Sequence, residues 1–78
     1  MKDLIFFLIK NITGNDQFEV VEEESEDRIN YVIKAPKEIM GLIIGKEGKT
    51  IRVIRTLVKV RATLERKIVN VSLEEKTN

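Results

Sequence analysis

The chain has 78 residues, of which 42% are hydrophobic and 35% charged, and its formal net charge is +1. It contains no cysteine and no histidine, which excludes disulfides, thiol chemistry and zinc sites built from Cys and His. This length predicts a single domain over residues 1–78. A domain of this size buries only about 60% of its unfolded surface, so pairing with a second chain would add stability.

The small net charge conceals two segments of opposite sign. Residues 1–30 carry eight acidic and three basic side chains, whereas residues 46–67 carry eight basic and two acidic ones. The basic segment supports the hypothesis of polyanion binding, and a plain solvated helix face is the alternative.

Residues 2–13 are predicted to form a helix that ends at Gly14-Asn15, a helix stop signal. Phe6 and Phe7 lie off its apolar stripe. We expect Phe7 in the core, whereas Phe6 fits either the core or a contact surface. The stripe itself consists of Leu4, Ile5, Leu8, Ile9 and Ile12.

The first helix contains a short apolar run, residues 4–9, that cannot span a membrane, and no small-residue cleavage site follows it. A small chain without disulfides is typical of a reducing compartment. We therefore expect a cytoplasmic protein with no membrane contact.

Two strands are predicted next, over residues 17–23 and 28–35, because apolar and polar side chains alternate in both. Phe18 and Val20 mark the inward face of the first. The acidic cluster of residues 22–27 is expected to solvate the hairpin tip and to discourage edge pairing. A cation site is the second interpretation, but the spacing of the acidic residues matches no known cation-binding loop. The inward face of the second strand is formed by Ile29, Tyr31, Ile33 and Ala35.

Pro36 precedes a predicted helix over residues 37–44, and a second helix is expected over residues 49–62. A strand over residues 67–73 completes the chain, with Val69, Val71 and Leu73 inward. The longer helix has a core stripe of Ile51, Ile54, Leu57, Val58 and Ala62, and a basic stripe of Lys49, Arg52, Arg55 and Lys59.

The predicted order is α-β-β-α-α-β. The consecutive strands should pair antiparallel, and the last strand should return parallel to the second after its helical crossover. These connections predict an α+β fold of two layers, in which a three-stranded mixed sheet carries its helices on one face.

The connection between the two later helices reads IIGKEGKTI over residues 43–51. Gly48-Lys49-Thr50 matches the end of a nucleotide-binding phosphate loop, but that motif needs a glycine at position 43, where Ile43 stands. A plain helix–helix turn is the second interpretation. The third is an anion site, because two glycines and two lysines lie just before the unpaired amides at the start of a helix.

This loop, with its apolar flanks, resembles the Gly-x-x-Gly signature of KH domains, and the element order is similar to the type II arrangement. Residues 35–58, APKEIMGLIIGKEGKTIRVIRTLV, and the opening MKDL resemble the small single-domain bacterial KH proteins of the KhpA type. The resemblance covers essentially the whole chain. In KH domains this loop clamps the backbone of about four nucleotides of single-stranded RNA.

The resemblance implies a clamp made of Gly45, Lys46, Glu47 and Gly48. Ile43, Ile44 and Ile51 would line or support the groove, and its rim would consist of Met40, Gly41, Lys49 and Arg52. It also implies an RNA chaperone without a cofactor that affects cell shape and wall synthesis. The partner would be a second copy or a larger KH-containing protein.

Two other functions fit the sequence less well. A protein-interaction module that kept the KH shape would use Phe6, the first helix and the acidic hairpin. An enzyme would need a base or nucleophile other than Cys or His, and no paired carboxylates in an apolar setting are evident. We therefore expect no catalysis.

Overall fold

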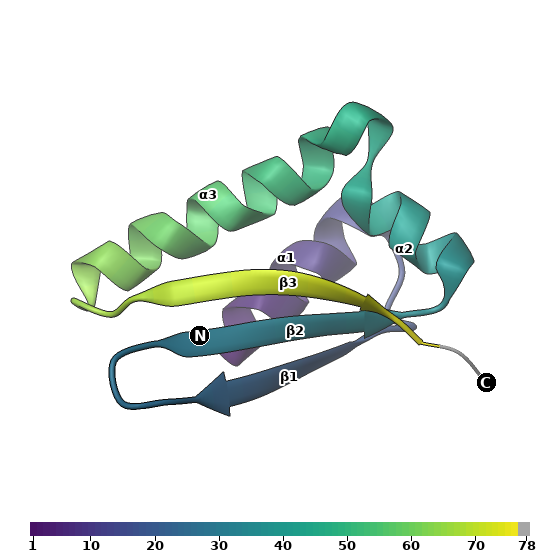
Figure 1. Ribbon diagram of the computed structural model, residues 1–78. Helices are drawn as coiled ribbons and strands as arrows, with labels where there is room; N and C mark the ends of the chain where they lie inside the picture. Colours follow the sequence, from purple (N-terminus) through teal and green to yellow (C-terminus); the bar gives the residue numbers. More distant parts are fainter. Residues whose placement is uncertain (77–78) are drawn as a thin grey trace.

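The computed structural model describes residues 1–76, which form one sheet with three helices packed against it (Figure 1). The order α-β-β-α-α-β is that of a type II KH fold, as predicted. The elements are α1 (Lys2–Thr13), β1 (Glu19–Glu24), β2 (Ile29–Ala35), α2 (Lys37–Ile44), a short 3-10 turn η1 (Lys46–Gly48), α3 (Lys49–Leu64) and β3 (Val69–Glu75).

The sheet has the order β1-β2-β3, with β2 in the centre. β1 pairs antiparallel with β2, from Glu19 opposite Lys34 to Glu24 opposite Ile29. β3 pairs parallel with β2, from Val69 beside Ile29 to Glu75 beside Ala35. Both pairings confirm the prediction, and they leave β1 and β3 as the two open edges of the sheet.

The core lies between one face of the sheet and the helices. The predicted inward face of β2 is fully confirmed, since Ile29, Tyr31, Ile33 and Ala35 are all buried. From the helices, Ile5 and Ile9 of α1 meet the buried side of α3, whose members are Ile51, Ile54, Val58 and Ala62. Burying an isoleucine of this kind contributes about 2 kcal/mol to folding.

Tyr31 reaches from the core to the β1 edge. Its hydroxyl donates a hydrogen bond of 2.8 Å to Oε1 of Glu22, the residue opposite it on β1. Burial is the main reason that the pKa of Tyr31 is raised well above its usual range, and the hydrogen bond with the Glu22 carboxylate adds to the effect.

The helix ends follow local rules with one exception. Gly14 ends α1 in the left-handed conformation, at φ 69°. At the end of α3 the same conformation falls on Arg66, at φ 57°. There the Lys67 amide donates to the Ala62 carbonyl at 2.8 Å, which closes the helix in the manner normally served by glycine.

Three predicted core positions are wrong. Phe7 is 62% exposed, because it lies two residues from each of the buried Ile5 and Ile9, and about 100° per residue places it on the opposite side of α1. Leu57 is 43% exposed, because it lies on a second apolar side of α3 that faces away from the core. Ile12, the last member of the predicted α1 stripe, is also exposed.

One buried residue on the open face of the sheet was not predicted. Val32 is only 7% exposed although it points away from the helices, since Val21 and Ser72 flank it in register on the two neighbouring strands. Elsewhere on that face the cross-strand neighbours are polar or charged and partly paired, as between Lys34 and Glu74. No helix in residues 1–76 has the length and apolar character needed to cross a bilayer.

Candidate nucleic-acid interface

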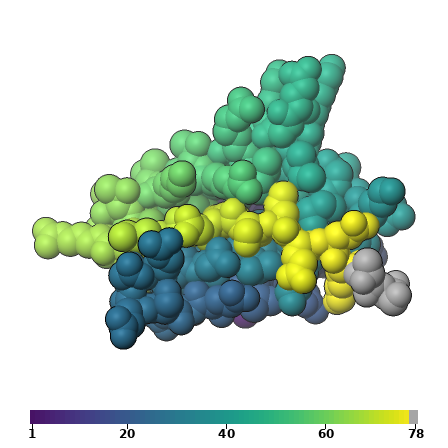
Figure 2. Space-filling model, viewed as in Figure 1, coloured from purple at the N-terminus to yellow at the C-terminus, as the bar shows by residue number. Residues whose placement is uncertain are grey.

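The Gly45–Gly48 loop joins α2 to α3 and stands out from the body of the molecule (Figure 2). Gly45 ends α2 with its amide bonded to the Gly41 carbonyl at 2.9 Å, and the Gly48 amide turns back to the Gly45 carbonyl at 3.2 Å. The Lys49 amide then bonds to the Lys46 carbonyl. These contacts fix a tight turn that leaves both lysine side chains exposed.

The two glycines are needed for different reasons. Gly45 has φ 76° and ψ 175°, and a Cβ there would lie 2.7 Å from Cβ of Thr50 and 3.0 Å from its amide nitrogen. Gly48 has φ 74°, but a Cβ there would meet open space. Gly45 is therefore required by sterics as well as by conformation, whereas Gly48 is favoured by conformation alone.

Glu47 adopts a left-handed conformation without being glycine, at φ 58°. Such a residue costs about 1 kcal/mol in backbone energy. Glu47 is exposed. Three of the four loop residues have positive φ, namely Gly45, Glu47 and Gly48. Backbone strain at a non-glycine residue such as Glu47 is typical of a functional site.

The start of α3 presents main-chain donors to the loop. Gly48 is the N-cap residue, and no side chain caps the helix there. The first amides of a helix have no partner within it, and the helix dipole adds partial positive charge at this end. In α3 the first of them, the Lys49 amide, is bonded to the Lys46 carbonyl of the loop. Lys46 and Lys49 contribute full charges beside them. The arrangement suits the phosphate of a nucleic-acid backbone.

The apolar residues predicted around the groove differ in exposure. Ile43, Ile51 and Met40 are buried, with exposed fractions of 0%, 6% and 9%. All three belong to the hydrophobic core of the domain. Ile44 is half-buried and Gly41 is exposed, so these two are accessible beside the loop. Leu42, the next residue of α2 after Gly41, is 50% exposed.

A groove between α3 and β3 extends the basic surface along the molecule. It has a volume of about 260 Å³ and is lined by Arg55, Lys59 and residues 69–71. Nε of Arg55 donates to the Val71 carbonyl at 3.2 Å, which ties α3 to the open edge of β3. From Lys49 to Lys59 the basic side of α3 runs for about 15 Å. The predicted basic stripe therefore borders a strand edge, a relationship that sequence periodicity alone did not reveal.

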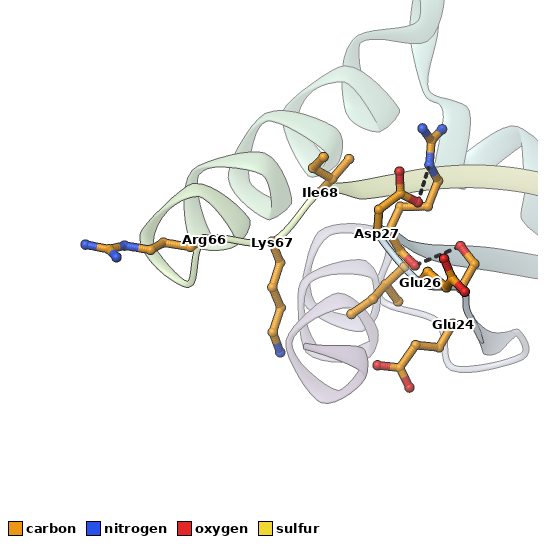
Figure 3. Close-up of a pocket in the computed structure, with 9 residues that line it drawn as sticks. Glu24, Glu26, Asp27, Arg66, Lys67 and Ile68 are labelled. Atoms are coloured by element: carbon orange, nitrogen blue, oxygen red, sulfur yellow. Dashed lines mark hydrogen bonds and ion pairs between the residues drawn. The ribbon is translucent and has the colours of Figure 1, made fainter.

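A second charged pocket lies at the other end of α3 and has mixed walls (Figure 3). It measures about 200 Å³ and lies between the β1–β2 turn and the α3–β3 connection. Glu24, Glu26 and Asp27 line one side, and Lys67 and Arg66 the other, with the Arg66 side chain pointing away from the pocket. Asp27 pairs with Arg28 at 3.5 Å. In residues 1–76 no group of three or more His, Cys, Asp or Glu side chains that could hold a metal ion comes together.

Comparison with known proteins identifies the family. The family model described as "KhpA/KhpB, KH domain" matches residues 2–73. A protein named RNA-binding protein KhpA from Chlamydia caviae is 40% identical over 75 residues, which cover 95% of this chain and 94% of the relative. The protein of the same name from Clostridium acetobutylicum is 35% identical over 74 residues, covering 94% and 99%. A third, from Listeria monocytogenes, is 36% identical over 59 residues, covering 74% and 78%. With a match that runs nearly from end to end and places the Gly-x-x-Gly loop inside it, the chain belongs to the KhpA/KhpB KH-domain family.

Proposed function

We propose that this protein binds single-stranded RNA by gripping the sugar–phosphate backbone at the Gly45–Gly48 loop. The observation that carries the proposal is the uncapped start of α3 directly behind that loop, between two exposed lysines. The relatives' name, RNA-binding protein KhpA, supports RNA as the ligand.

In this mechanism each group has a defined part. Gly45 and Gly48 let the strand approach the main chain, and the amides of Lys46 and Glu47 meet its phosphates. Arg52 and Lys49 add charge on the α3 side. Gly41 and Ile44 border the path of the bases, while the loop is held in shape from beneath by Met40, Ile43 and Ile51.

Glu47 moderates the affinity. Its carboxylate repels phosphate, and a single clamp touches few phosphates, so binding should be weak and loosely specific with a shallow dependence on salt. Weak and exchangeable contact with many strands suits an RNA chaperone. We extend this to a cytoplasmic role in post-transcriptional control that is linked to cell shape and wall homeostasis.

Pairing with a second copy, or with a larger KH-containing protein, would compensate for the weak single site through avidity. Four apolar side chains on α3 support such pairing, since they are 43–77% exposed and follow one another at intervals of four, three and four residues: Val53, Leu57, Val60 and Leu64. This spacing is that of a coiled-coil seam. We call these four residues the α3 seam.

The test of RNA binding reverses the charge of Lys46 and shortens the acid at Glu47. The variant Lys46→Asp with Glu47→Asp should lose most of its affinity for a short single-stranded RNA, measured by fluorescence anisotropy at low salt. The matched control is Lys2→Asp, which removes a lysine and adds an acid in the first turn of α1, where an acid is favourable. Equal affinity of the loop variant and the wild-type protein, with the fold checked by circular dichroism, would remove the loop from the mechanism.

A protein-interaction module is the second candidate function, and the exposed α3 seam is the observation that favours it. It predicts no RNA binding even at low salt, together with a tight complex with another protein. The low-salt titration above separates the two candidates.

A further inference from the structure

The open edge of β1 lies beside an apolar groove. The groove has a volume of about 410 Å³ and lies between the first half of α1 and the start of β1. Its apolar floor is an aromatic pair, Phe6 and Phe18, with ring centroids 4.7 Å apart. Phe6 is 37% exposed, so part of this pair is accessible to solvent. The remaining lining residues are Lys2, Asp3, Glu19, Val20 and Val21.

The hydrogen-bond pattern shows which β1 groups are free at this edge. The Ser25 amide bonds to the Arg28 carbonyl at 2.9 Å, which makes this the first hydrogen-bonded pair of the hairpin. In an antiparallel ladder such pairs alternate with pairs whose main-chain groups turn outward. With the register of β1 and β2, the outward groups belong to Val20, Glu22 and Glu24.

The charge around this edge selects the occupant. Residues 16–27 carry seven acidic side chains and no basic one. Two lysines from other segments reach this edge, because Lys2 lines the groove and Lys76 pairs with Glu19 at 3.1 Å, but acidic side chains outnumber them. A second copy cannot pair its own β1 here, because the same acids would face each other across the junction. RNA is repelled for the same reason. A basic segment would be attracted to this edge. Because the acidic side chains repel both a second copy of β1 and RNA, they make the edge selective.

We propose that the β1 edge binds an extended segment of a protein partner in which basic and apolar residues alternate. The segment adds a fourth strand by bonding to the outward groups of Val20, Glu22 and Glu24. Its apolar residues face the helix side and enter the groove beside Phe6. Its basic residues lie on the other face of the sheet, on the side of Glu19 and Glu23. The site is separate from the Gly45–Gly48 loop and from the α3 seam, and it does not depend on RNA binding.

The probe is a fluorescent synthetic hexapeptide of sequence KVKFKV, with EVEFEV as its charge-reversed partner. Titrating KVKFKV into the full chain should give saturable binding that weakens with salt. Amide shifts in a ¹⁵N spectrum should fall on β1 and on α1 near Phe6, and hydrogen exchange should slow at Val20, Glu22 and Glu24. Absence of saturable binding, or equal binding of EVEFEV, would overturn the proposal.

Two pairs of variants locate the site. Phe6→Ala should weaken KVKFKV binding roughly tenfold, as expected for an aromatic anchor, while Phe7→Ala on the exposed far side of α1 leaves it unchanged. Glu24→Pro removes an outward amide and should weaken binding beyond Glu24→Gln, which removes the charge alone. Equal effects within both pairs would contradict a site at this edge.

A competition with RNA completes the test. Single-stranded RNA added to the peptide complex should not release the peptide, because the two ligands use opposite charges on different elements. If RNA displaces the peptide or shifts the same β1 amides, the edge is a nucleic-acid surface and the proposal fails. The peptide titration stands by itself even where RNA does not bind.

Discussion

The side chain of Thr50 fills the space that a side chain on Gly45 would need. A Cβ on Gly45 would lie 2.7 Å from Cβ of Thr50, well inside contact distance, and the Thr50 hydroxyl is closer still. The first residue of the loop and the second residue of α3 are therefore fitted to each other. Few residues other than glycine can occupy position 45 while α3 begins where it does.

This fit predicts unequal effects of alanine at the two glycines. Gly45→Ala should destabilise the fold by about 3 kcal/mol through both the clash and the backbone strain. Gly48→Ala should cost only about 1 kcal/mol, since its Cβ meets open space. Urea denaturation measures both. Thr50→Ala should relieve only part of the Gly45→Ala defect, and complete relief would show that the hydroxyl alone causes the clash.

The basic side of α3 predicts the salt dependence of RNA binding. Arg55→Gln should weaken binding to single-stranded RNA and lower the slope of log K against log salt by about 0.7, the value for one phosphate contact. Arg61→Gln is the matched control on the same helix, because Arg61 pairs with Glu65 at 2.6 Å on another side of α3. Equal slopes for the two variants would place the RNA away from the α3–β3 groove.

The buried phenol of Tyr31 predicts a loss of stability at high pH. Its pKa in the folded chain is raised, so the folded state holds a proton that the unfolded state releases above pH 10.0, the ordinary tyrosine value. Stability should therefore be unaffected at neutral pH and should fall as pH rises beyond that value.

Ultraviolet titration reports this residue without ambiguity, because the chain has one tyrosine. Phenolate absorbance should appear at a higher pH than for free tyrosine, and its appearance should coincide with unfolding. Glu22→Gln should leave the pKa above the ordinary value, since burial is its main cause. A normal titration with the fold intact would contradict the buried position of Tyr31.

The left-handed Arg66 predicts a stabilising substitution. Arg66→Gly removes the backbone strain at the end of α3 and should raise the free energy of unfolding by up to about 1 kcal/mol. At the next residue there is no such strain to remove, so Lys67→Gly should lower the free energy of unfolding. Thermal or urea denaturation shows whether each variant is more or less stable than the wild-type protein. A loss of stability in both variants would argue against strain at Arg66.

The α3 seam predicts the state of association. Val60→Lys should shift the protein towards the monomer in sedimentation-velocity experiments, because it places a charge in the middle of the seam. Ile12→Lys, which alters an exposed apolar residue on α1, should leave association unchanged. If both variants sediment as the wild-type protein does, the seam is not the pairing surface.

Sequence periodicity predicted the order of the elements, the sheet pairing and most of the core, because alternation and helical spacing directly reflect burial. It failed where a helix has two apolar sides. Leu57 fits the spacing of Ile54 and Val58 almost as well as that of Val53 and Val60, so only packing decides between them. Val32 was missed because its burial comes from its neighbours in register, and the α3–β3 groove because two distant segments form it.

The boundaries show the same limitation. β3 covers Val69–Glu75 where the alternation predicted residues 67–73, and α3 continues to Leu64 beyond the predicted residue 62. The turn between them is closed by main-chain bonds from Glu65, Arg66 and Lys67, which need a left-handed arginine rather than the glycine that marks such ends in sequence.

α3 turns one side to the core, a second, basic side to the β3 edge and a third, apolar side to solvent. If each of these three sides has the proposed role, few positions of this helix can be substituted without loss of stability or binding. Sequence variation in the family should then be greatest at the borders between these sides, at Thr56 and Thr63. The hydroxyls of these two threonines donate to carbonyls of their own helix.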